Sequence, residues 1–175
     1  MKNLKLTTIA LSLLVLSGCS SDTKVVKSSD LVGTWSRCLD LQDGSSINEV
    51  YVFTKTTLTK TLKRYGAISC NKDEIYSHID ISYNYTLGAN TNYSNGKSAS
   101  EYDFTATTYT DYMHDGSDIP DIGRTIYSMC NIDDNILHEA TSNETDGLFD
   151  GSSSEKRMRH FHVEYYSPNY LEKQQ

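Results

Sequence analysis

The chain has 175 residues and a formal net charge of −7, which becomes −9 once an N-terminal leader carrying Lys2 and Lys5 is set aside. Such an acidic protein is not expected to bind nucleic acid, or to hold anionic lipid by charge attraction. Thirteen Tyr and only two Pro favour β-strands over helices.

Residues 1–18 form three zones: the basic start MKNLK, the apolar stretch LTTIALSLLVL, and a small-residue site that ends in LSGC at Cys19. The apolar stretch is too short for a transmembrane helix. LSGC has the spacing and small residues of a lipobox, so the segment resembles a bacterial lipoprotein signal peptide. The resemblance implies removal of residues 1–18 and acylation of Cys19 on its thiol and its new amine. An ordinary secretory signal is the alternative.

The residues after Cys19 bear on where the protein goes. No Asp directly follows Cys19, which resembles the outer-membrane sorting pattern of Gram-negative cells, with the domain facing the periplasm. The acyl chains are then the expected membrane contact. Residues 19–30 are polar and Ser-rich, so we expect a flexible tether there.

The stretch IYSHIDISYNYTLG carries the clearest strand pattern of the chain. Its apolar residues alternate with polar ones, which places one set on one face. That set is Ile79, Ile81, Tyr83, Tyr85 and Leu87. Similar patterns occur at residues 32–41, 47–55, 57–65, 100–109, 124–132, 135–141 and 157–166, with turn residues between them. The pattern predicts eight strands, followed by a C-terminal tail at 168–175.

Eight consecutive antiparallel strands with one apolar face have two ways to bury it. They close into an up-and-down barrel or stack as a β-sandwich. Closure removes the exposed edges, which favours the all-β barrel, but alternation alone does not separate the barrel from the sandwich, which is the alternative.

The first strand begins with Gly33, Thr34 and Trp35, the GxW signature with which lipocalins and other calycins begin theirs. YVFTKTTLTKTLKRYGAISC and IDISYNYTLG resemble the second to fourth strands of small bacterial lipocalin-like lipoproteins. YSMCNIDDNILHEA and RMRHFHVEYY resemble the closing strands. The resemblance covers residues 31–167 and implies a lipocalin-like barrel.

Trp35 is predicted to plug the narrow end of that barrel, with Gly33 allowing a neighbouring chain to approach it. In lipocalins a basic residue near the last strand packs over this Trp. Here the resemblance implies Arg157 or Arg159 in that role. A cation over an indole contributes about 0.5–2 kcal/mol.

Three cysteines remain after Cys19, namely Cys38, Cys70 and Cys130, so they cannot all pair within one chain. An oxidising compartment favours at least one disulfide. The first and third strands of an up-and-down barrel run the same way, which favours Cys38 with Cys70 and leaves Cys130 as a thiol. Pairing of Cys38 with Cys130, or three free thiols, are the alternatives.

No catalytic motif is present: the sequence contains no G-x-S-x-G, P-loop, G-x-G-x-x-G or H-E-x-x-H. We therefore do not expect an enzyme or a cofactor. His160 and His162 have the spacing of a pair on one strand face, but that face is expected to meet solvent. No metal site is predicted.

The predicted inner face is rich in aromatic rings, several with hydroxyl tips. If they line an open cup, it suits a small hydrophobic or amphipathic ligand, and if the barrel is narrow they fill its core. The candidate lining residues are Tyr51, Phe53, Tyr83, Tyr85, Tyr102 and Phe104. Two functions follow: a membrane-anchored lipocalin-like lipoprotein that binds such a ligand, or a structural lipoprotein with a filled barrel that contacts another envelope protein.

Overall fold

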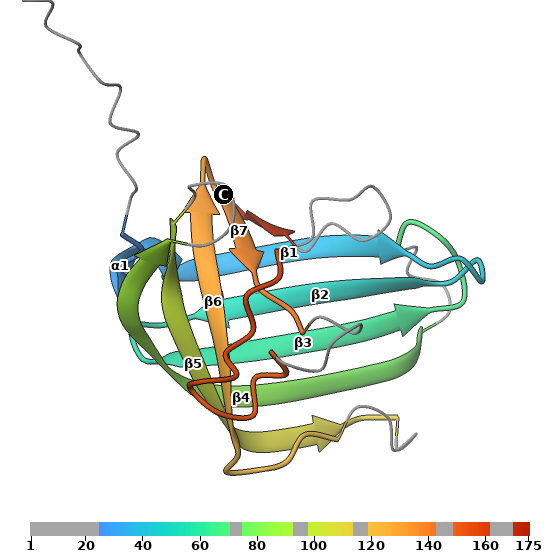
Figure 1. The fold of residues 1–175 in the computed structure, drawn as a ribbon. Helices are drawn as coiled ribbons and strands as arrows, with labels where there is room; N and C mark the ends of the chain where they lie inside the picture. The colour runs from blue at the N-terminus through green and yellow to red at the C-terminus, as the bar shows by residue number, and fades with distance from the viewer. Residues whose placement is uncertain (1–24, 71–74, 93–97, 114–118, 143–148, 162–169) are drawn as a thin grey trace, which may run out of the picture.

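The computed structural model describes residues 25–70, 75–92, 98–113, 119–142, 149–161 and 170–175, which form a closed barrel of eight antiparallel strands. Each strand pairs with the next in sequence, and the last closes on the first (Figure 1). The strands are β1 (Gly33–Asp40), β2 (Ser46–Phe53), β3 (Thr57–Tyr65), β4 (Ile75–Asn92), β5 (Ser98–Asp111), β6 (Thr125–Asp133), β7 (Ile136–Glu139) and β8 (Tyr170–Lys173). The predicted up-and-down barrel is confirmed, and the sandwich alternative is wrong.

Alternation along β4 produces the barrel core as predicted. Its four inward residues, Ile79, Ile81, Tyr83 and Tyr85, are all buried, and Leu87 packs against them. Two register shifts with β5, after Ser82 and after Leu87, mark irregularities in the ladder. Such bulges bend a strand, which helps the long β4 to curve around the barrel.

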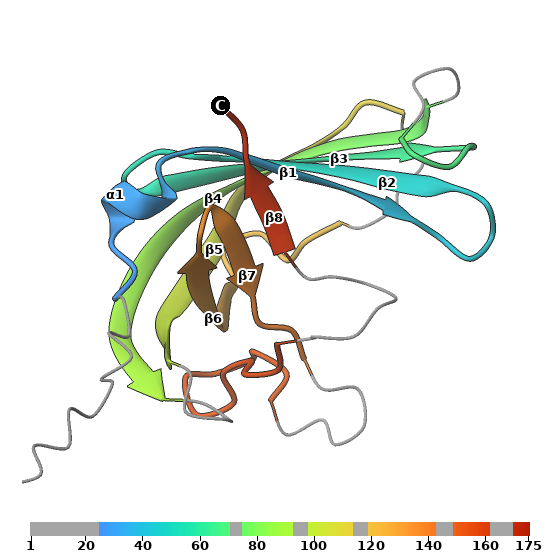
Figure 2. The same cartoon turned by 90° about the horizontal axis from the view of Figure 1, so that it is seen from above.

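The strands differ greatly in length. β4 has 18 residues and β5 has 14, whereas β7 and β8 have four each. Figure 2 shows β1, β2 and β3 running well beyond the short β7 and β8, while β4 curves round the opposite side. The short strands therefore cover only the part of the long sheet nearest α1 (Ser28–Leu31).

Part of the predicted tether is packed against the barrel. Val26 and Leu31 are buried, and the backbone N–H of Val26 donates to Oγ of Ser100 at 3.1 Å. The four-residue helix α1 lies between these contacts. Residues 25–30, predicted as part of a flexible tether, are thus held against the barrel, because Val26 of this polar run is buried in the core. Residues 19–24 lie outside the described part of the chain.

The last strand is not where the alternation placed it. The predicted strand was 157–166, but of its described residues only His160 forms a bridge, an isolated one with Thr141. β8 comes instead from the predicted C-terminal tail and pairs with both β7 and β1. Residues 162–169 lie outside the described chain. A strand of four residues is too short to show a period-two pattern, which is why the sequence did not reveal it.

The predicted disulfide is confirmed. Cys38 and Cys70 are bonded, with their Cα atoms 5.9 Å apart, and Cys130 is a buried free thiol. The bridge joins the outer face of β1 to the turn after β3. It ties together two strands that both neighbour β2.

Closure by β8 can be tested at Leu171, which is fully buried between β7 and the core. Leu171→Ala should lower the free energy of unfolding by about 2–5 kcal/mol, since it removes buried methyl groups and leaves a cavity. Urea denaturation followed by the fluorescence of Trp35, the only Trp, measures the change.

The matched control is Glu172→Ala in the same strand, where the side chain is exposed. Its effect should stay within about 0.5 kcal/mol. Equal stability of the Leu171 variant and the parent protein would contradict the assignment of β8 as the closing strand.

Candidate functional site

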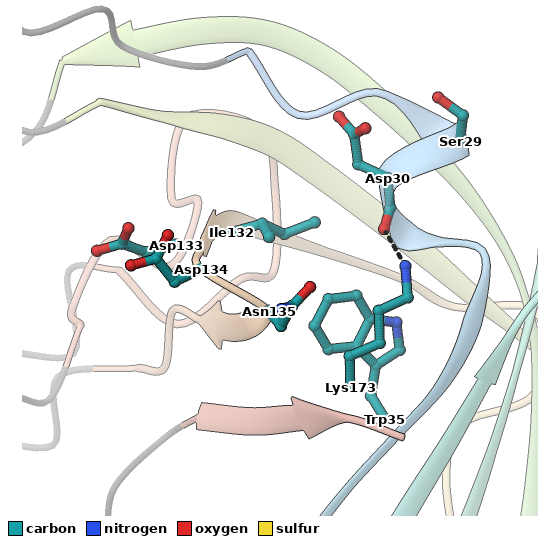
Figure 3. Close-up of a pocket in the computed structure, with 8 residues that line it drawn as sticks. All are labelled: Ser29, Asp30, Trp35, Ile132, Asp133, Asp134, Asn135 and Lys173. Atoms are coloured by element: carbon teal, nitrogen blue, oxygen red, sulfur yellow. Dashed lines mark hydrogen bonds between the residues drawn. The ribbon is translucent and has the colours of Figure 1, made fainter. Parts of the chain in front are cut away.

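Trp35 plugs one end of the barrel. The ring is fully buried, and its Nε1–H donates to the carbonyl of Leu31 at 2.7 Å. Lys173 runs along the indole, with Nζ 5.1 Å from the ring centroid, and donates to the carbonyl of Asp30 at 3.3 Å (Figure 3). Gly33 has φ +132°, and a Cβ there would lie 3.2 Å from Cε of Lys173. Glycine is therefore needed beside this lysine.

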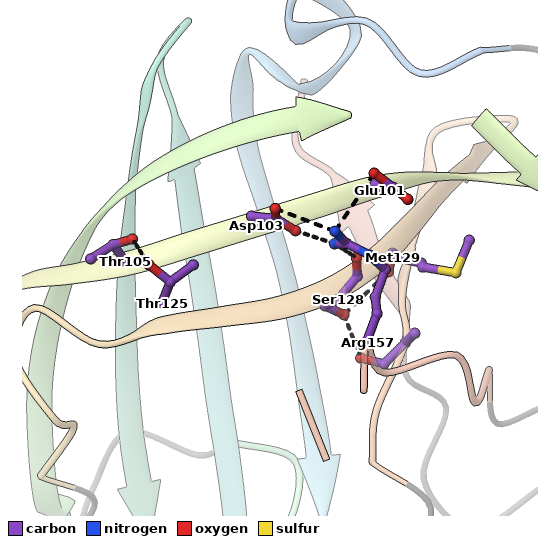
Figure 4. A network of polar contacts seen from close by, with 8 residues as sticks. Glu101, Asp103, Thr105, Thr125, Ser128, Met129 and Arg157 are labelled. Carbon is purple, nitrogen blue, oxygen red and sulfur yellow. Dashed lines mark hydrogen bonds and ion pairs between the residues drawn. The ribbon is translucent and has the colours of Figure 1, made fainter. Parts of the chain in front are cut away.

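The prediction that Arg157 or Arg159 covers Trp35 is wrong. Arg157 is buried on the outer face of β5 and β6, where its guanidinium donates to both carboxylate oxygens of Asp103 (Figure 4). It also donates to the carbonyl of Ser128 at 2.8 Å. This arginine therefore fastens its segment to the outside of the barrel.

The physical reason for the error is the identity of the closing strand. Because β8 pairs with β1, its own cation, Lys173, is the one that reaches the plug. The guanidinium of Arg159 lies instead 5.2 Å from the ring of Phe149. The basic residue near the last strand is present, but in the segment that was predicted as a tail.

A surface hollow of about 450 Å³ lies beside the plug. It is lined by Ser29, Asp30, Trp35, Ile132, Asp133, Asp134, Asn135 and Lys173 (Figure 3). The carboxylates of Asp133 and Asp134 are exposed in the β6–β7 turn, and Asp30 accepts a hydrogen bond from the N–H of Lys27. None of these lining residues has a buried polar atom without a partner in the described chain. The polar groups that line this hollow are therefore either solvated or already hydrogen-bonded.

The six aromatic residues predicted to line a cup mostly fill the barrel. They are Tyr51, Phe53, Tyr83, Tyr85, Tyr102 and Phe104, and all are buried. Ring centroids lie 5.4 Å apart for Phe53 and Tyr85, and 5.1 Å apart for Tyr102 and Phe104. Such distances are typical of packed aromatic pairs. This part of the barrel is a filled core, and two of the six residues, Tyr51 and Phe104, also line a cavity.

That cavity, which we call the polar cavity, has a volume of about 260 Å³. It combines apolar surface with charged groups. Its lining residues are Arg37, Tyr51, Lys60, Phe104, Glu139, Ala140, Thr141, Ser142, Met158 and Leu171. Sequence reasoning did not select the three charged ones. Parity could have found them, because Lys60 lies between the inward Leu58 and Leu62, and Glu139 lies two residues after the buried Leu137.

Arg37 is held at one side of the polar cavity by Glu49, which lies opposite it on β2. Nε of Arg37 donates to Oε2 of Glu49 at 2.6 Å, and both side chains are largely buried. Burial by itself lowers the pKa of Arg37, but the charge and hydrogen bond of Glu49 outweigh it and raise the pKa. This pair is tight and mutually neutralising.

The second ion pair is looser. Nζ of Lys60 lies 3.5 Å from Oε2 of Glu139, although the two side chains are only 11% and 16% exposed. Charge-assisted hydrogen bonds are normally about 2.7–2.9 Å long. The ammonium lies 4.3 Å from the ring centroid of Tyr51 and 4.7 Å from that of Phe104. The ammonium of Lys60 therefore contacts two aromatic faces as well as the carboxylate of Glu139.

Glu139 has an unmet hydrogen-bonding capacity. Its Oε1 is buried and has no hydrogen-bond partner among the described residues. A buried acceptor left in this state costs about 1–3 kcal/mol, and more when it is charged. The pKa of Tyr51 is raised well above its usual range by burial, and further by the charges of Glu139 and Glu49. A hydrogen bond to Glu139 adds to the rise, so Tyr51 stays protonated. Of the two carboxylate oxygens of Glu139, Oε1 is the one without a partner among the described residues.

Cys130 pairs with Glu139 across β6 and β7, but its thiol is not a nucleophile. Burial raises the pKa of Cys130, and the charge of Glu139 raises it further. A neutral buried thiol is inert. The described residues include no group of three or more His, Cys, Asp or Glu that could hold a metal ion, and His162 lies outside them.

The arrangement is therefore suited to binding: a small cavity with an apolar floor, an ammonium and an open carboxylate oxygen. No family model matches this chain, and no curated protein matches its sequence. Within the described residues, no helix is long and apolar enough to cross a membrane.

The buried tyrosines predict a loss of stability at high pH. Burial, followed by the charge of Glu139, raises the pKa of Tyr83 to about 12 from its ordinary value near 10. The folded protein thus holds this proton more tightly than the unfolded chain, so the contribution is complete below pH 10 and is lost as the pH rises to about 12.

We expect the free energy of unfolding to fall over this interval, and Tyr83→Phe to reduce the fall by up to roughly 2–3 kcal/mol. Urea denaturation at a series of pH values measures both proteins. The two proteins differ only at residue 83, so the difference between their pH dependences isolates the hydroxyl of Tyr83. Identical pH dependence would contradict the assignment.

Proposed function

We propose that this chain is a lipid-anchored, lipocalin-like protein of the bacterial cell envelope whose polar cavity binds a small amphipathic ligand. The observation that carries the proposal is the buried Oε1 of Glu139, which has no partner among the described residues and belongs to a residue lining a cavity of about 260 Å³. Buried polar atoms in proteins almost always have a partner. A bound ligand with a donor group supplies one.

The lining of the cavity accounts for the amphipathic character. Phe104 and Leu171 offer apolar surface, while Lys60 and Glu139 offer charge. Binding sites for small molecules have this composition, with a few polar groups among apolar ones. The packed rings deeper in the barrel limit the apolar part of the ligand to a short one.

The plug supports the lipocalin-like assignment. The GxW signature lies at the start of β1, and a cation from the last strand, Lys173, packs over Trp35 as the resemblance implies for a basic residue. An eight-stranded up-and-down barrel is the architecture of that family. The shared features thus extend from one motif to the closure of the barrel.

The proposed anchor has a short reach. Acylation at Cys19 leaves residues 20–25 before Val26, which is buried against the barrel. Six extended residues span at most about 20 Å. The anchor would therefore hold the α1 end of the barrel close to the lipid surface. The proposed location is the outer membrane, with the domain facing the periplasm.

A second candidate is an interaction lipoprotein, and one observation favours it. Four large apolar side chains are exposed around the β5–β6 connection: Tyr112, Met113, Ile119 and Ile122, with Ile119 the most exposed at 65%. Exposed apolar groups of this kind occur at protein interfaces. The filled part of the barrel is equally compatible with this function.

Ligand binding can be tested by native mass spectrometry of the full-length chain carrying Cys19→Ser, which removes the proposed acylation site and avoids detergent. We expect an added mass that is lost on denaturation. Ser142→Trp should abolish it, because an indole at this lining position fills the polar cavity.

Ser154→Trp is the matched control, since Ser154 is exposed and does not line the cavity. It should retain the added mass. If the protein carries no ligand and also binds neither octanoate nor L-leucine when these are supplied, the binding function is rejected and the interaction function is favoured.

The anchor predicts that Cys19→Ala shifts the protein from the membrane pellet to the soluble fraction. Two or three acyl chains contribute about 0.8 kcal/mol per buried CH₂, enough for stable attachment. Cell fractionation after a high-salt wash measures the distribution. Ser20→Ala should remain in the pellet, and a Cys19→Ala protein that also remained there would rule out acylation as the anchor.

A further inference from the structure

The charges around the polar cavity sum to zero. Arg37 and Lys60 contribute two positive charges, and Glu49 and Glu139 contribute two negative ones. A ligand with a net charge would bring an unbalanced charge into a largely buried site, which is costly. The neutral set of residues therefore favours a ligand that is neutral overall.

Only one of the two ion pairs can accept a ligand easily. Arg37 and Glu49 are joined at 2.6 Å, so each already has a close partner. Lys60 and Glu139 are 3.5 Å apart, and Oε1 of Glu139 has no partner among the described residues. An ammonium has three donors, and the hydrogen bond from Lys60 to Glu139 uses one of them. The cavity thus offers one open acceptor beside one donor-rich cation.

A ligand carrying both signs of charge satisfies both groups together. Its cationic group donates to Oε1 of Glu139, and its anionic group accepts from Lys60. Each new contact is a charge-assisted hydrogen bond, which is stronger than the loose pair it supplements. An anion alone would leave Glu139 unsatisfied, and a cation alone would leave Lys60 without a close partner.

The volume restricts the rest of the ligand. At about 260 Å³ the polar cavity is smaller than the roughly 300–1,000 Å³ of pockets for drug-sized molecules. Leu171 and the ring of Phe104 contribute to its apolar surface. There is room for a short apolar group but not for a long acyl chain.

We propose that the polar cavity binds a compact zwitterion of the free α-amino-acid class, with its ammonium on Glu139, its carboxylate on Lys60 and a short apolar side chain against Phe104 and Leu171. This inference rests on the proposed binding function and names the chemical class of its ligand.

The test compares three related ligands near neutral pH by isothermal titration calorimetry with the full-length Cys19→Ser protein. L-leucine carries both charges, N-acetyl-L-leucine keeps only the carboxylate, and L-leucinamide keeps only the ammonium. L-leucine should bind at least about tenfold more tightly than either analogue, because each analogue lacks one charge-assisted hydrogen bond.

Two variants assign the charges to residues. Glu139→Gln should weaken the binding of L-leucine by roughly tenfold and leave the affinity for N-acetyl-L-leucine unchanged. Lys60→Met should weaken the binding of L-leucine and leave the affinity for L-leucinamide unchanged. Asp121→Asn and Lys156→Met remove exposed charges of residues that do not line the cavity, and should change none of the affinities. The ligand series on the parent protein does not depend on the folding of any cavity variant.

The outcomes separate this inference from the binding function itself. Equal affinity for the three ligands would overturn the proposal that the ligand is a zwitterion and leave the binding function in place. The same conclusion would follow if L-leucine does not bind, octanoate does, and Ser142→Trp abolishes the binding of octanoate. If neither L-leucine nor octanoate binds and the protein carries no ligand, both proposals fail.

Discussion

The pairing of β8 with β1 closes the barrel, and much else in the structure depends on it. The contact is short, with Trp35 opposite Lys173 and Ser36 opposite Glu172. Without it β1 and β7 would each present an open edge, which sheet proteins avoid. The same strand also holds the plug, because Lys173 packs on Trp35 and donates to the carbonyl of Asp30. The neighbouring carbonyl of Leu31, at the end of α1, accepts the indole N–H. The closing strand thus also holds the N-terminal segment against the barrel.

Closure determines how much interior space remains. Near the start of β1, the rings of Phe53 and Tyr85 meet edge to face and fill the interior. Farther along β1, Arg37 replaces apolar side chains on the inner face, and Lys60 and Glu139 approach from β3 and β7. The polar cavity is where the aromatic packing ends and charged residues begin.

The charged groups of the polar cavity are better explained by binding than by stability. Burying an ion pair often gains nothing over apolar residues of the same volume, and an unsatisfied oxygen adds a further cost. The Arg157 site on the outer surface shows the contrast, since its guanidinium is bound by Asp103 and by the carbonyl of Ser128. There the charges are fully engaged and serve to hold segment 149–161 in place. At Glu139 one oxygen is left open.

The pairing of Cys38 with Cys70 was predicted from the strand directions of an up-and-down barrel. Alternation along the chain was enough to predict the all-β class, the first seven strands and the inward face of β4, because strand parity is a local property. It could not identify the closing strand. RMRHFHVEYY alternates over ten residues, whereas β8 has only four, and the choice between them depends on contacts with β1 and β7 that are distant in sequence. The tertiary structure also decided which cation covers Trp35, how the aromatic interior is filled, and that Lys60 meets Glu139. Each of these depends on which side chains of separate strands reach the same space.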